Sequence, residues 1–364
     1  MKNPLKYFAE LKDPRVERTR EHLLEEILLI TIAAVLSAAG SWNETEGYGK
    51  AKRLWLRRFL KLPAGIPSHD TINRVISGLD PAELEKGFVA WVSSIAKLTA
   101  GEVVAIDGKA LCGTREAGNK ALVHMVSAWA SANSLVLAQR KVDDKSNEIT
   151  AIPKLLAALE LSGTVVTIDA MGCQRAIAEK IVAKKADYIL AVKENQGHLL
   201  EEIKDSFQML TADAVEEEID CAHGRVERCR CSVIADLSLV EKAAEWASLQ
   251  GLVRILAERF HKATGKTENE TRYYITGLKP DAGKLNRAIR RHWGIENKLH
   301  WTLDVSFGKD LDRKRTGNAA QNFSILNRIA PNLLRQDKST QLGIKGKRLK
   351  TGWDNDYLLQ LLGI

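Results

Sequence analysis

Apolar residues in the first quarter of the chain recur at the three- and four-residue spacing that is typical of helices. Residues 20–39 have the length and periodicity of one helix, and residues 45–60 resume the pattern after a break. Ser68 follows a proline-containing turn and is placed to cap a further helix, and Asp80, just before a proline, opens another. We therefore predict an all-helical region over residues 1–98.

Part of this region has the pattern of a DNA-reading helix-turn-helix. A short helix, a Gly/Pro turn at residues 63–67 and a second helix bearing Asn73 and Arg74 follow one another. The preceding helix carries a basic cluster that consists of Lys50, Lys52, Arg53, Arg57 and Arg58. A helical bundle that only packs on the next domain has the same pattern, so both interpretations stay open.

From Gly101 onward, short β-branched runs replace the helical pattern. Three strands are predicted first, at residues 102–106, 122–130 and 135–142. Helices and strands then alternate, with helices at 147–161 and 174–185, strands at 164–168 and 188–192, and a last helix towards Phe207. A meander followed by this alternation predicts an α/β fold, a mixed sheet with helices on its faces, in the order of a ribonuclease-H-like core that begins with residues 99–207.

Residues 208–282 interrupt this order and predict a β-rich insertion. An acidic stretch at 215–220 precedes expected strands at 221–234, 252–260 and 272–276, with a polar loop at 261–269. The final helices of the core return over residues 283–335, and a basic tail follows at 336–364. Basic clusters at residues 313–315 and 345–350 would suit a duplex backbone, although such clusters are usually solvated surface.

The composition narrows the class of protein. Of 364 residues, 45% are hydrophobic and 27% charged, as in an ordinary globular chain with a full core. The net charge of +8 favours a polyanionic partner, most obviously nucleic acid. Five scattered cysteines and the lack of a signal-peptide pattern predict a reduced cytoplasmic setting. The longest apolar run, residues 27–39, is too short to span a bilayer, so we expect no membrane partner.

Two aspartates stand where strands are predicted to end. Asp107 follows its apolar run and precedes Gly108, and Asp169 follows its run and is separated from Gly172 by two residues. Ligands of open α/β sheets bind at the carboxyl ends of strands, and glycine there lets a backbone approach closely. Each aspartate alone is consistent with a turn or a helix cap. Two at equivalent strand ends, with a third acid on a late helix, indicate a shared site.

The third acid is Glu296, within residues 287–309. If this segment is helical, one of its faces carries Trp293, Glu296, Asn297, His300, Trp301 and Asp304. The helix would bring Glu296 beside the two aspartates, and carboxylates held at ~4 Å repel by several kcal/mol unless cations bind. Oxygen ligands without thiolate or paired imidazole select Mg²⁺ or Mn²⁺. Two such ions serve an in-line attack on the phosphorus of a nucleic acid.

Polar neighbours of these acids are candidates for DNA contacts. Asn297 and His300 can hydrogen-bond a phosphate or a carboxylate, or simply pack on the helix. Lys109 and Gln174 lie just past the two aspartates, where a DNA contact and a solvated loop are the alternatives. Asp304 is either a spare acid or an orienting partner for His300.

The aromatic and cysteine residues have two interpretations each. Trp293 and Trp301 can stack on an extruded base, although tryptophans at helical spacing are more often core. Cys221 and His223 with Cys229 and Cys231 resemble a zinc site in composition, but the spacing is not that of a finger or knuckle, and strand residues explain them. The charged residues of 223–228 face either a phosphate backbone or solvent.

Six motifs, taken in order, resemble one family. They are KDPR, AIDGKA with Asp107, TIDAMGCQ with Asp169, HGRVERC, HWGIENKLHWTLDVSFGKD with Glu296, and KGKRLKTGWD. This set is similar to the insertion-sequence transposases of the DDE class, in the H-repeat-associated (ISAs-type) group. The resemblance implies a ribonuclease-H-like catalytic core with a β-rich insertion and a helical N-terminal region. It also implies that Asp107, Asp169 and Glu296 are the catalytic, metal-binding triad.

One departure from the related transposases concerns the helix of Glu296. Their signature is Tyr-x2-Arg-x3-Glu-x6-Lys, and the corresponding positions here are Ile289, His292 and Leu303. The phosphate-binding tasks would pass to other residues of the same helix. The residues that we expect to contact DNA are therefore Lys109, Gln174, Arg290, Arg291, Asn297, Lys298 and His300.

The resemblance and the residues together predict a DNA transposase. It would cut the ends of its own element by metal-assisted hydrolysis and join the freed 3′-hydroxyl to target DNA, with double-stranded DNA as its partner. A homodimer on paired ends and a bacterial cytoplasmic, nucleoid-associated location are expected. A metal-dependent nuclease without strand joining and a catalytically silent, transposase-derived DNA-binding protein are the alternatives.

Overall fold

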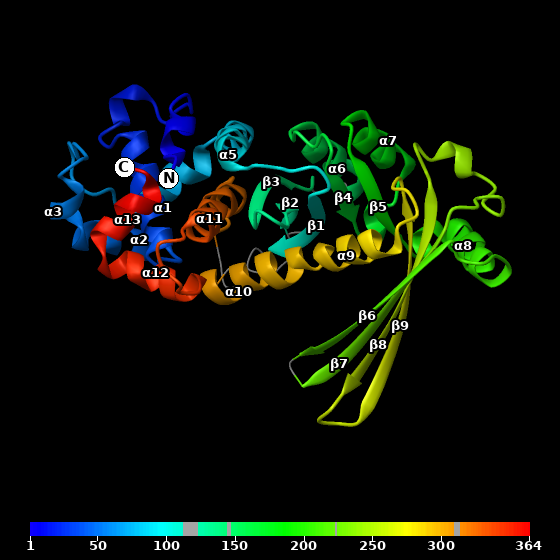
Figure 1. Ribbon diagram of the computed structural model, residues 1–364. Helices are drawn as coiled ribbons and strands as arrows, with labels where there is room; N and C mark the ends of the chain where they lie inside the picture. Colours follow the sequence, from blue (N-terminus) through cyan, green and yellow to red (C-terminus); the bar gives the residue numbers. More distant parts are fainter. Residues whose placement is uncertain (112–122, 144–146, 223, 309–313) are drawn as a thin grey trace, which may run out of the picture.

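The computed structural model describes residues 1–111, 123–143, 147–222, 224–308 and 314–364 (Figure 1). In these residues nine strands form one mixed sheet, in the order β3-β2-β1-β4-β5-β9-β8-β7-β6. Helices pack on both faces of its first half (Figure 1). The α/β class predicted from the hydrophobic pattern is confirmed.

The first five strands position the acidic residues. The antiparallel meander consists of β1 (Val103–Leu111), β2 (Val123–Ala130) and β3 (Leu135–Lys141). On the other side of β1, β4 (Val165–Ile168) and β5 (Asp187–Val192) run parallel to it. The connecting helices are α6 (Glu148–Ala157) and α7 (Arg175–Ala183). Since β4 and β5 are buried on both faces, their short β-branched runs predicted them correctly.

One strand is longer than its apolar run. The sequence predicted that the first strand stops before Asp107, but β1 continues to Leu111 because Gly108–Leu111 pair with Val126–Val123 of β2. Asp107 therefore lies inside β1, opposite Ser127, and not after its end. The prediction was correct for Asp169, which directly follows β4.

The insertion continues the sheet. Its strands are β6 (Ala214–Ala222), β7 (Arg225–Ile234), β8 (Gly251–His261) and β9 (Lys266–Thr276). β9 pairs antiparallel with β5, so the core and the insertion share one sheet. Figure 1 shows the far ends of these four strands extending well beyond the helices, and we call β6–β9 the arm.

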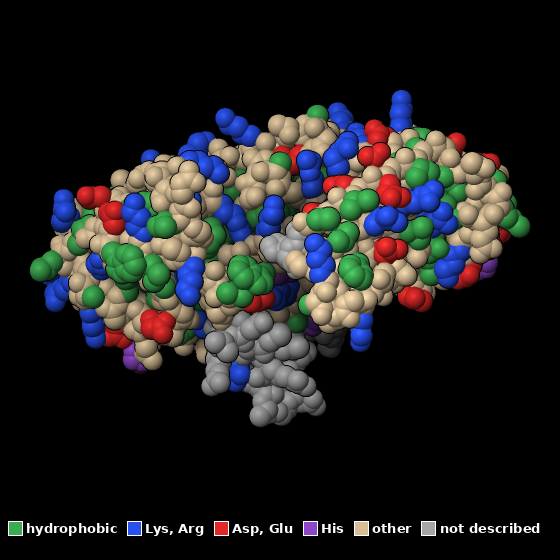
Figure 2. Space-filling model, turned by 60° about the horizontal axis from the view of Figure 1, so that its bottom comes forward, with side chains coloured by type: hydrophobic (Ala, Val, Ile, Leu, Met, Phe, Trp, Pro, Cys, Tyr) green, Lys and Arg blue, Asp and Glu red, His purple; other side chains and the backbone are tan. Residues whose placement is uncertain are grey.

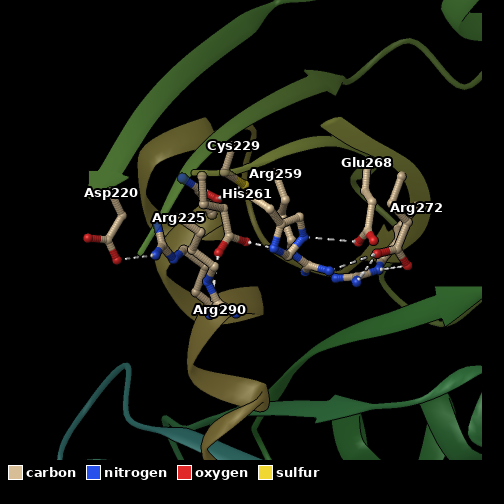
Figure 3. Close-up of polar contacts among 11 residues, drawn as sticks. Asp220, Arg225, Cys229, Arg259, His261, Glu268, Arg272 and Arg290 are labelled. Carbon is tan, nitrogen blue, oxygen red and sulfur yellow. Dashed lines mark hydrogen bonds and ion pairs between the residues drawn. The ribbon is translucent and has the colours of Figure 1, made fainter. Parts of the chain in front are cut away.

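Two parts of the arm differ from the prediction. The acidic stretch at 215–220 is most of a strand, β6, and the polar loop expected at 261–269 is largely strand, because Lys266 already pairs with His261. The first six residues of β9 are exposed, so no buried face imposes an alternating pattern. Cross-strand ion pairs such as Glu227–Arg259, at 3.3 Å, connect the strands instead (Figure 3).

The terminal helices form one body next to β3. From the N-terminal side they are α1 (Leu24–Leu36), α2 (Trp42–Ala51), α3 (Arg53–Leu56), α4 (His69–Gly78) and α5 (Pro81–Ile95). From the C-terminal side they are α11 (Ala319–Gln336), α12 (Ile344–Trp353) and α13 (Asn355–Leu362). The buried α11 packs against α1, α4, α5 and β3, and both chain ends lie close together (Figure 1). The predicted caps are present: Ser68 accepts from Thr71 at 3.2 Å, and Asp80 accepts from Ala82 at 2.8 Å.

The basic C-terminal clusters are partly internal, contrary to the expectation of a surface for DNA. Lys347 is buried and donates to the carbonyls of Leu334 and Asp337 at 3.0 and 2.7 Å. Arg348 is buried and donates to the carbonyl of Val35 at 2.7 Å. Lys314 is also buried, whereas Arg313 lies outside the described residues. Among the helices described, none is both long and apolar enough to cross a membrane.

The remaining helices connect the arm to the helical body. They are α8 (Gly197–Met209), α9 (Ala282–His292), the π-helical turn η7 (Ile295–His300) and α10 (Trp301–Phe307). Figure 1 shows α9, η7 and α10 as one long run beneath the sheet. The apolar side of α9, which includes Leu285 and Ile289, packs with Val103 and Val165 of the sheet. This packing directs the next turns of the run towards Asp107.

Candidate active site

Register places the two aspartates side by side. Ile106 and Ile168 are partners in the parallel ladder of β1 and β4, and Asp107 and Asp169 are the next residue on each strand. Adjacent strands lie about 4.8 Å apart, so the two carboxyl groups share one edge of the sheet. By strand alternation, Asp107 has the same facing as Val103, which packs against α9.

The third predicted acid reaches this edge from the helical run. Glu296 lies in η7, where the N–H of Trp301 donates to the carbonyl of Glu296, five residues back. The regular helix predicted for this segment is therefore widened by a π turn, a feature that often marks functional sites. The negative charge of Glu296 contributes to raising the pKa of Asp107, so the two carboxylates lie near each other.

A cavity of about 400 Å³ opens beside these acids. Its lining includes Asp107, Asp169, Lys193, Arg272, Trp293 and Glu296. The guanidinium of Arg272 lies 4.1 Å from the centre of the Trp293 ring and also pairs with Glu270. The cavity thus joins carboxylates from β1, β4 and η7 to cations and an indole from β5, β9 and α9.

The fold buries these acidic side chains close together, although burial and their like charges disfavour the ionised form. Burial and neighbouring charges raise the pKa of Asp107 from 3.8 to about 7, and the charges belong, in decreasing order, to Asp169, Glu296 and Glu148. Burial also raises the pKa of Asp169, and hydrogen bonds from the backbone together with the charge of Lys193 oppose that rise. Such a cluster favours protons or cations in the space between its members.

Glu148 is an acid of this cluster that the sequence analysis missed. It is the first residue of α6, and burial and the charge of Asp169 raise its pKa. A methyl group added to Gly108 would lie 1.8 Å from Oε1 of Glu148, so the carboxylate occupies the space that a side chain at position 108 would need. The Gly that follows Asp107 was the only signal of this approach, and it did not identify the partner.

Two of the predicted DNA contacts also lie against carboxylates of the sheet edge and the helical run. His300 is only 7% exposed, and its Nδ1 lies 3.4 Å from Oδ2 of Asp107. Asp304, considered from the sequence as a spare acid or as a partner for His300, pairs with Lys109. Both contacts connect β1 to the helical run and hold it across the sheet edge.

The other predicted contacts are divided between two surfaces. Arg290 faces the arm, where it pairs with Glu218 at 3.0 Å and approaches Asp220 at 3.5 Å (Figure 3). Arg291, Asn297 and Lys298 are exposed, as is Trp301, and Gln174 is half-buried at the start of α7. Of the five residues expected to share a face with Glu296, Asn297 and Trp301 are therefore exposed to solvent.

The positions of the missing signature residues all point into the fold. Ile289 and Leu303 are 4% and 0% exposed. His292 lies 2.8 Å from Oγ1 of Thr167, and burial lowers its pKa to about 4. Ile289 and His292 also line the cavity beside the acids, but none of the three positions holds a cation at neutral pH.

The acidic side chains offer the oxygen ligands that hard metal ions prefer, although they do not stand at the spacing of metal ligands in this structure. The described residues contain no group of three or more His, Cys, Asp and Glu side chains at the spacing of metal ligands. The donors that line the cavity are nevertheless carboxylate oxygens, which Mg²⁺ and Mn²⁺ prefer. The zinc alternative loses support: Cys229 and Cys231 are buried strand residues, Cys221 is exposed, and His223 lies outside the described residues.

An α/β sheet with carboxylates on neighbouring strands and a third on a crossing helix defines the class of this protein, and the comparisons with known proteins agree. The family described as "Transposase DDE domain" matches residues 99–333, and the family described as "DDE_Tnp_1-associated" matches residues 5–92. The chain belongs to the DDE-domain transposase family, as its motifs indicated.

Its relatives include proteins of the H-repeat group. It is 40% identical over 367 residues to "Putative transposase YncI" of Escherichia coli O157:H7, covering 98% of this chain and 94% of that protein. It is 38% identical over 371 residues to "H repeat-associated putative transposase YhhI" of Escherichia coli strain K12, covering 100% of this chain and 98% of that protein. The resemblance to the H-repeat-associated group is thereby confirmed.

Proposed function

We propose that this chain is a DNA transposase that cuts the ends of an insertion sequence and joins the freed 3′-hydroxyl to target DNA. The observation that carries the proposal is the placement of Asp107 and Asp169 at adjacent positions of parallel strands, with Glu296 beside them. Family membership favours a transposase over other enzymes that act on phosphodiesters.

The sheet supports a ribonuclease-H-like core. An antiparallel meander of β1, β2 and β3, followed by β4 and β5 parallel to β1, agrees with the order of elements along the chain from which that fold was expected. We keep the proposed division into a helical region at 1–98, core segments at 99–207 and 283–335, an insertion at 208–282 and a C-terminal segment at 336–364. The helical run that carries Glu296 returns to the core only after the insertion.

Asp107, Asp169 and Glu296 would hold two Mg²⁺ or Mn²⁺ ions. When bound, such ions supply a nucleophile at neutral pH and stabilise the leaving oxygen. The chain itself must lose a proton from Asp107, whose pKa is about 7, before this carboxylate can act as a ligand. His300 would help to hold the Asp107 carboxylate, because its Nδ1 lies 3.4 Å from Oδ2 of Asp107.

Double-stranded DNA would lie across the face that carries α9 and α10. In Figure 2 this face is turned forward, and Lys and Arg side chains lie on both sides of its central hollow. Arg291, Asn297 and Lys298 are exposed beside Glu296, and Arg74 is exposed on α4 in the proposed helix-turn-helix. We propose that two copies act together on paired ends, because an element has two ends to cut.

A cleavage assay tests this function. The substrate is a duplex that contains the inverted repeats flanking the coding region, with Mn²⁺ or Mg²⁺ present. The wild-type chain should nick the element ends, and Asp169→Asn should bind the same duplex without nicking it. A wild-type chain that binds the ends without cutting them would overturn the proposal in favour of a silent DNA-binding protein.

A further inference from the structure

Arg291 and Lys298 are exposed near Glu296 but do not line the cavity, so a cation inside the cavity must come from elsewhere in the fold. The signature positions for Tyr, Arg and Lys hold Ile289, His292 and Leu303, and none of these supplies a cation at neutral pH, since burial lowers the pKa of His292 to about 4. A phosphodiester that enters a cavity lined by five carboxylates, three of them the predicted triad, carries a like charge and needs a cation nearby. The lining of the cavity identifies the candidates.

Three cationic side chains line the cavity: Lys193, Lys204 and Arg272. Lys204 pairs with Glu201 at 2.7 Å, and Arg272 is engaged by Glu270 and by the ring of Trp293. In the part of the chain that the structure describes, the ammonium of Lys193 makes no hydrogen bond or ion pair, and the residue is exposed. Lys193 is thus the cation of this cavity whose charge remains available to a ligand.

Local structure fixes Lys193 beside the acids. It directly follows β5, which runs parallel to β4, so its turn is the neighbour of the turn that follows Asp169. Two side chains of the turn bind that neighbour: Nδ2 of Asn195 donates to the carbonyl of Ala170 at 2.7 Å, and Nε2 of Gln196 donates to the carbonyl of Cys173 at 2.8 Å.

The electrostatics agree with this placement. Lys193 and Asp169 line the same cavity, and in the described residues no ion pair joins their side chains. A cation near a carboxylate but not neutralised by it can bind a further anion, as a point charge does for a phosphate. The hydrogen bonds of Asn195 and Gln196 already order this turn, so Lys193 loses less conformational freedom when it binds a ligand.

We propose that Lys193 binds the phosphate group that the chain cleaves, in place of the lysine that Leu303 replaces, and that Asn195 and Gln196 hold it beside Asp169. This inference rests on the proposed function. The ligand is a phosphodiester of a DNA strand at the element end. Lys193 contacts it directly, whereas Asn195 and Gln196 act only by positioning the turn.

Removing the charge of the phosphate and the charge of Lys193, separately and together, tests the contact. The position cut by the wild-type chain is first mapped in Mg²⁺, and a duplex is made with a neutral methylphosphonate at that phosphate alone. Affinities of the full-length chain for both duplexes are measured in EDTA, where no cleavage occurs. The wild-type chain and Lys193→Arg should bind the neutral duplex about 10-fold more weakly than the native one. Lys193→Ala should bind the native duplex about 10-fold more weakly than the wild-type chain does. Its affinity for the neutral duplex should be nearly the same as its affinity for the native duplex.

Two variants separate this role from general effects. Lys180→Ala removes an exposed charge from α7. It should show the same penalty as the wild-type chain, where the penalty is the loss of affinity on going from the native to the neutral duplex. Asn195→Ala should reduce the penalty, whereas a merely structural role for Asn195 would leave it unchanged. An equal penalty for Lys193→Ala and wild type would overturn the contact while leaving the transposase function intact. A wild-type chain that binds neither duplex would overturn the function and this inference together.

Discussion

Replacing Asp107 with asparagine should stabilise the protein in the absence of divalent cations. The pKa of this aspartate rises from 3.8 in the unfolded chain to about 7 in the folded protein, which corresponds to about 4 kcal/mol lost from the folding free energy above pH 7. Asparagine removes this cost but also removes the charge that faces Nδ1 of His300 at 3.4 Å, a contact worth about 1 kcal/mol. We expect a net gain of about 2 to 3 kcal/mol for Asp107→Asn.

The pH dependence gives the sign of the effect. Because the folded pKa is raised, the cost is absent below about pH 4, grows as the pH rises towards 7 and is constant above it. Urea unfolding in EDTA at pH 5.5 and pH 8 should therefore show a larger advantage for Asp107→Asn at pH 8. Adding Mg²⁺ should stabilise the wild-type chain and narrow the difference, since ligand binding favours the state that binds.

A control and a clear contradiction complete this test. Glu160 is an exposed acid that follows α6, and Glu160→Gln should change stability by no more than about 0.5 kcal/mol at either pH. If Asp107→Asn is less stable than wild type at pH 8 in EDTA, the carboxylates do not repel one another as described. An advantage that does not increase between pH 5.5 and pH 8 would contradict the raised pKa.

Three further predictions concern other parts of the molecule. Glu296→Gln should abolish Mg²⁺-dependent cleavage while end binding in a gel-shift assay stays within about 3-fold of wild type, because the exposed cations remain. Glu148→Gln should lower the pKa of Asp107, measured as a shift to lower pH in the pH dependence of stability in EDTA. Lys347→Ala should destabilise the protein by about 3 kcal/mol in urea unfolding, because it leaves the buried Asp337 without its cation.

Each of these has an outcome that contradicts it. Cleavage retained by Glu296→Gln removes this residue from the triad. An unchanged pH dependence for Glu148→Gln means that this carboxylate lies too far from Asp107 to act on it. Normal stability of Lys347→Ala, with weaker and less salt-dependent DNA binding, would restore the interpretation of the C-terminal segment as a DNA-binding surface.

The sequence predicted the parts of the fold that are set by local pattern. Short β-branched runs identified β4 and β5 because both faces of these strands are buried. The same pattern located Asp169 correctly and placed Asp107 next to it. Capping residues likewise identified the starts of α4 and α5, since Ser68 and Asp80 bind backbone groups only two or three residues away.

The features that were missed depend on distant partners. β1 extends past Asp107 because β2 pairs with it, and polar β9 is a strand because β8 pairs along its whole length. Glu148 joins the acids because α6 packs against β2 and β3, so nothing near it in the sequence indicates its role. Lys347 appeared to be surface charge because its carbonyl partners lie ten or more residues away.

The most direct test of the central claim is strand joining at this single site. A precut element end with a 3′-hydroxyl is incubated with the chain, target DNA and Mn²⁺, beside an identical end with a 3′-dideoxy terminus. The account predicts joined products from the hydroxyl end alone, and none from either end with Asp169→Asn. If the wild-type chain cuts intact element ends but never joins the precut hydroxyl end to target DNA, the proposed strand-joining function is wrong and the protein is a nuclease.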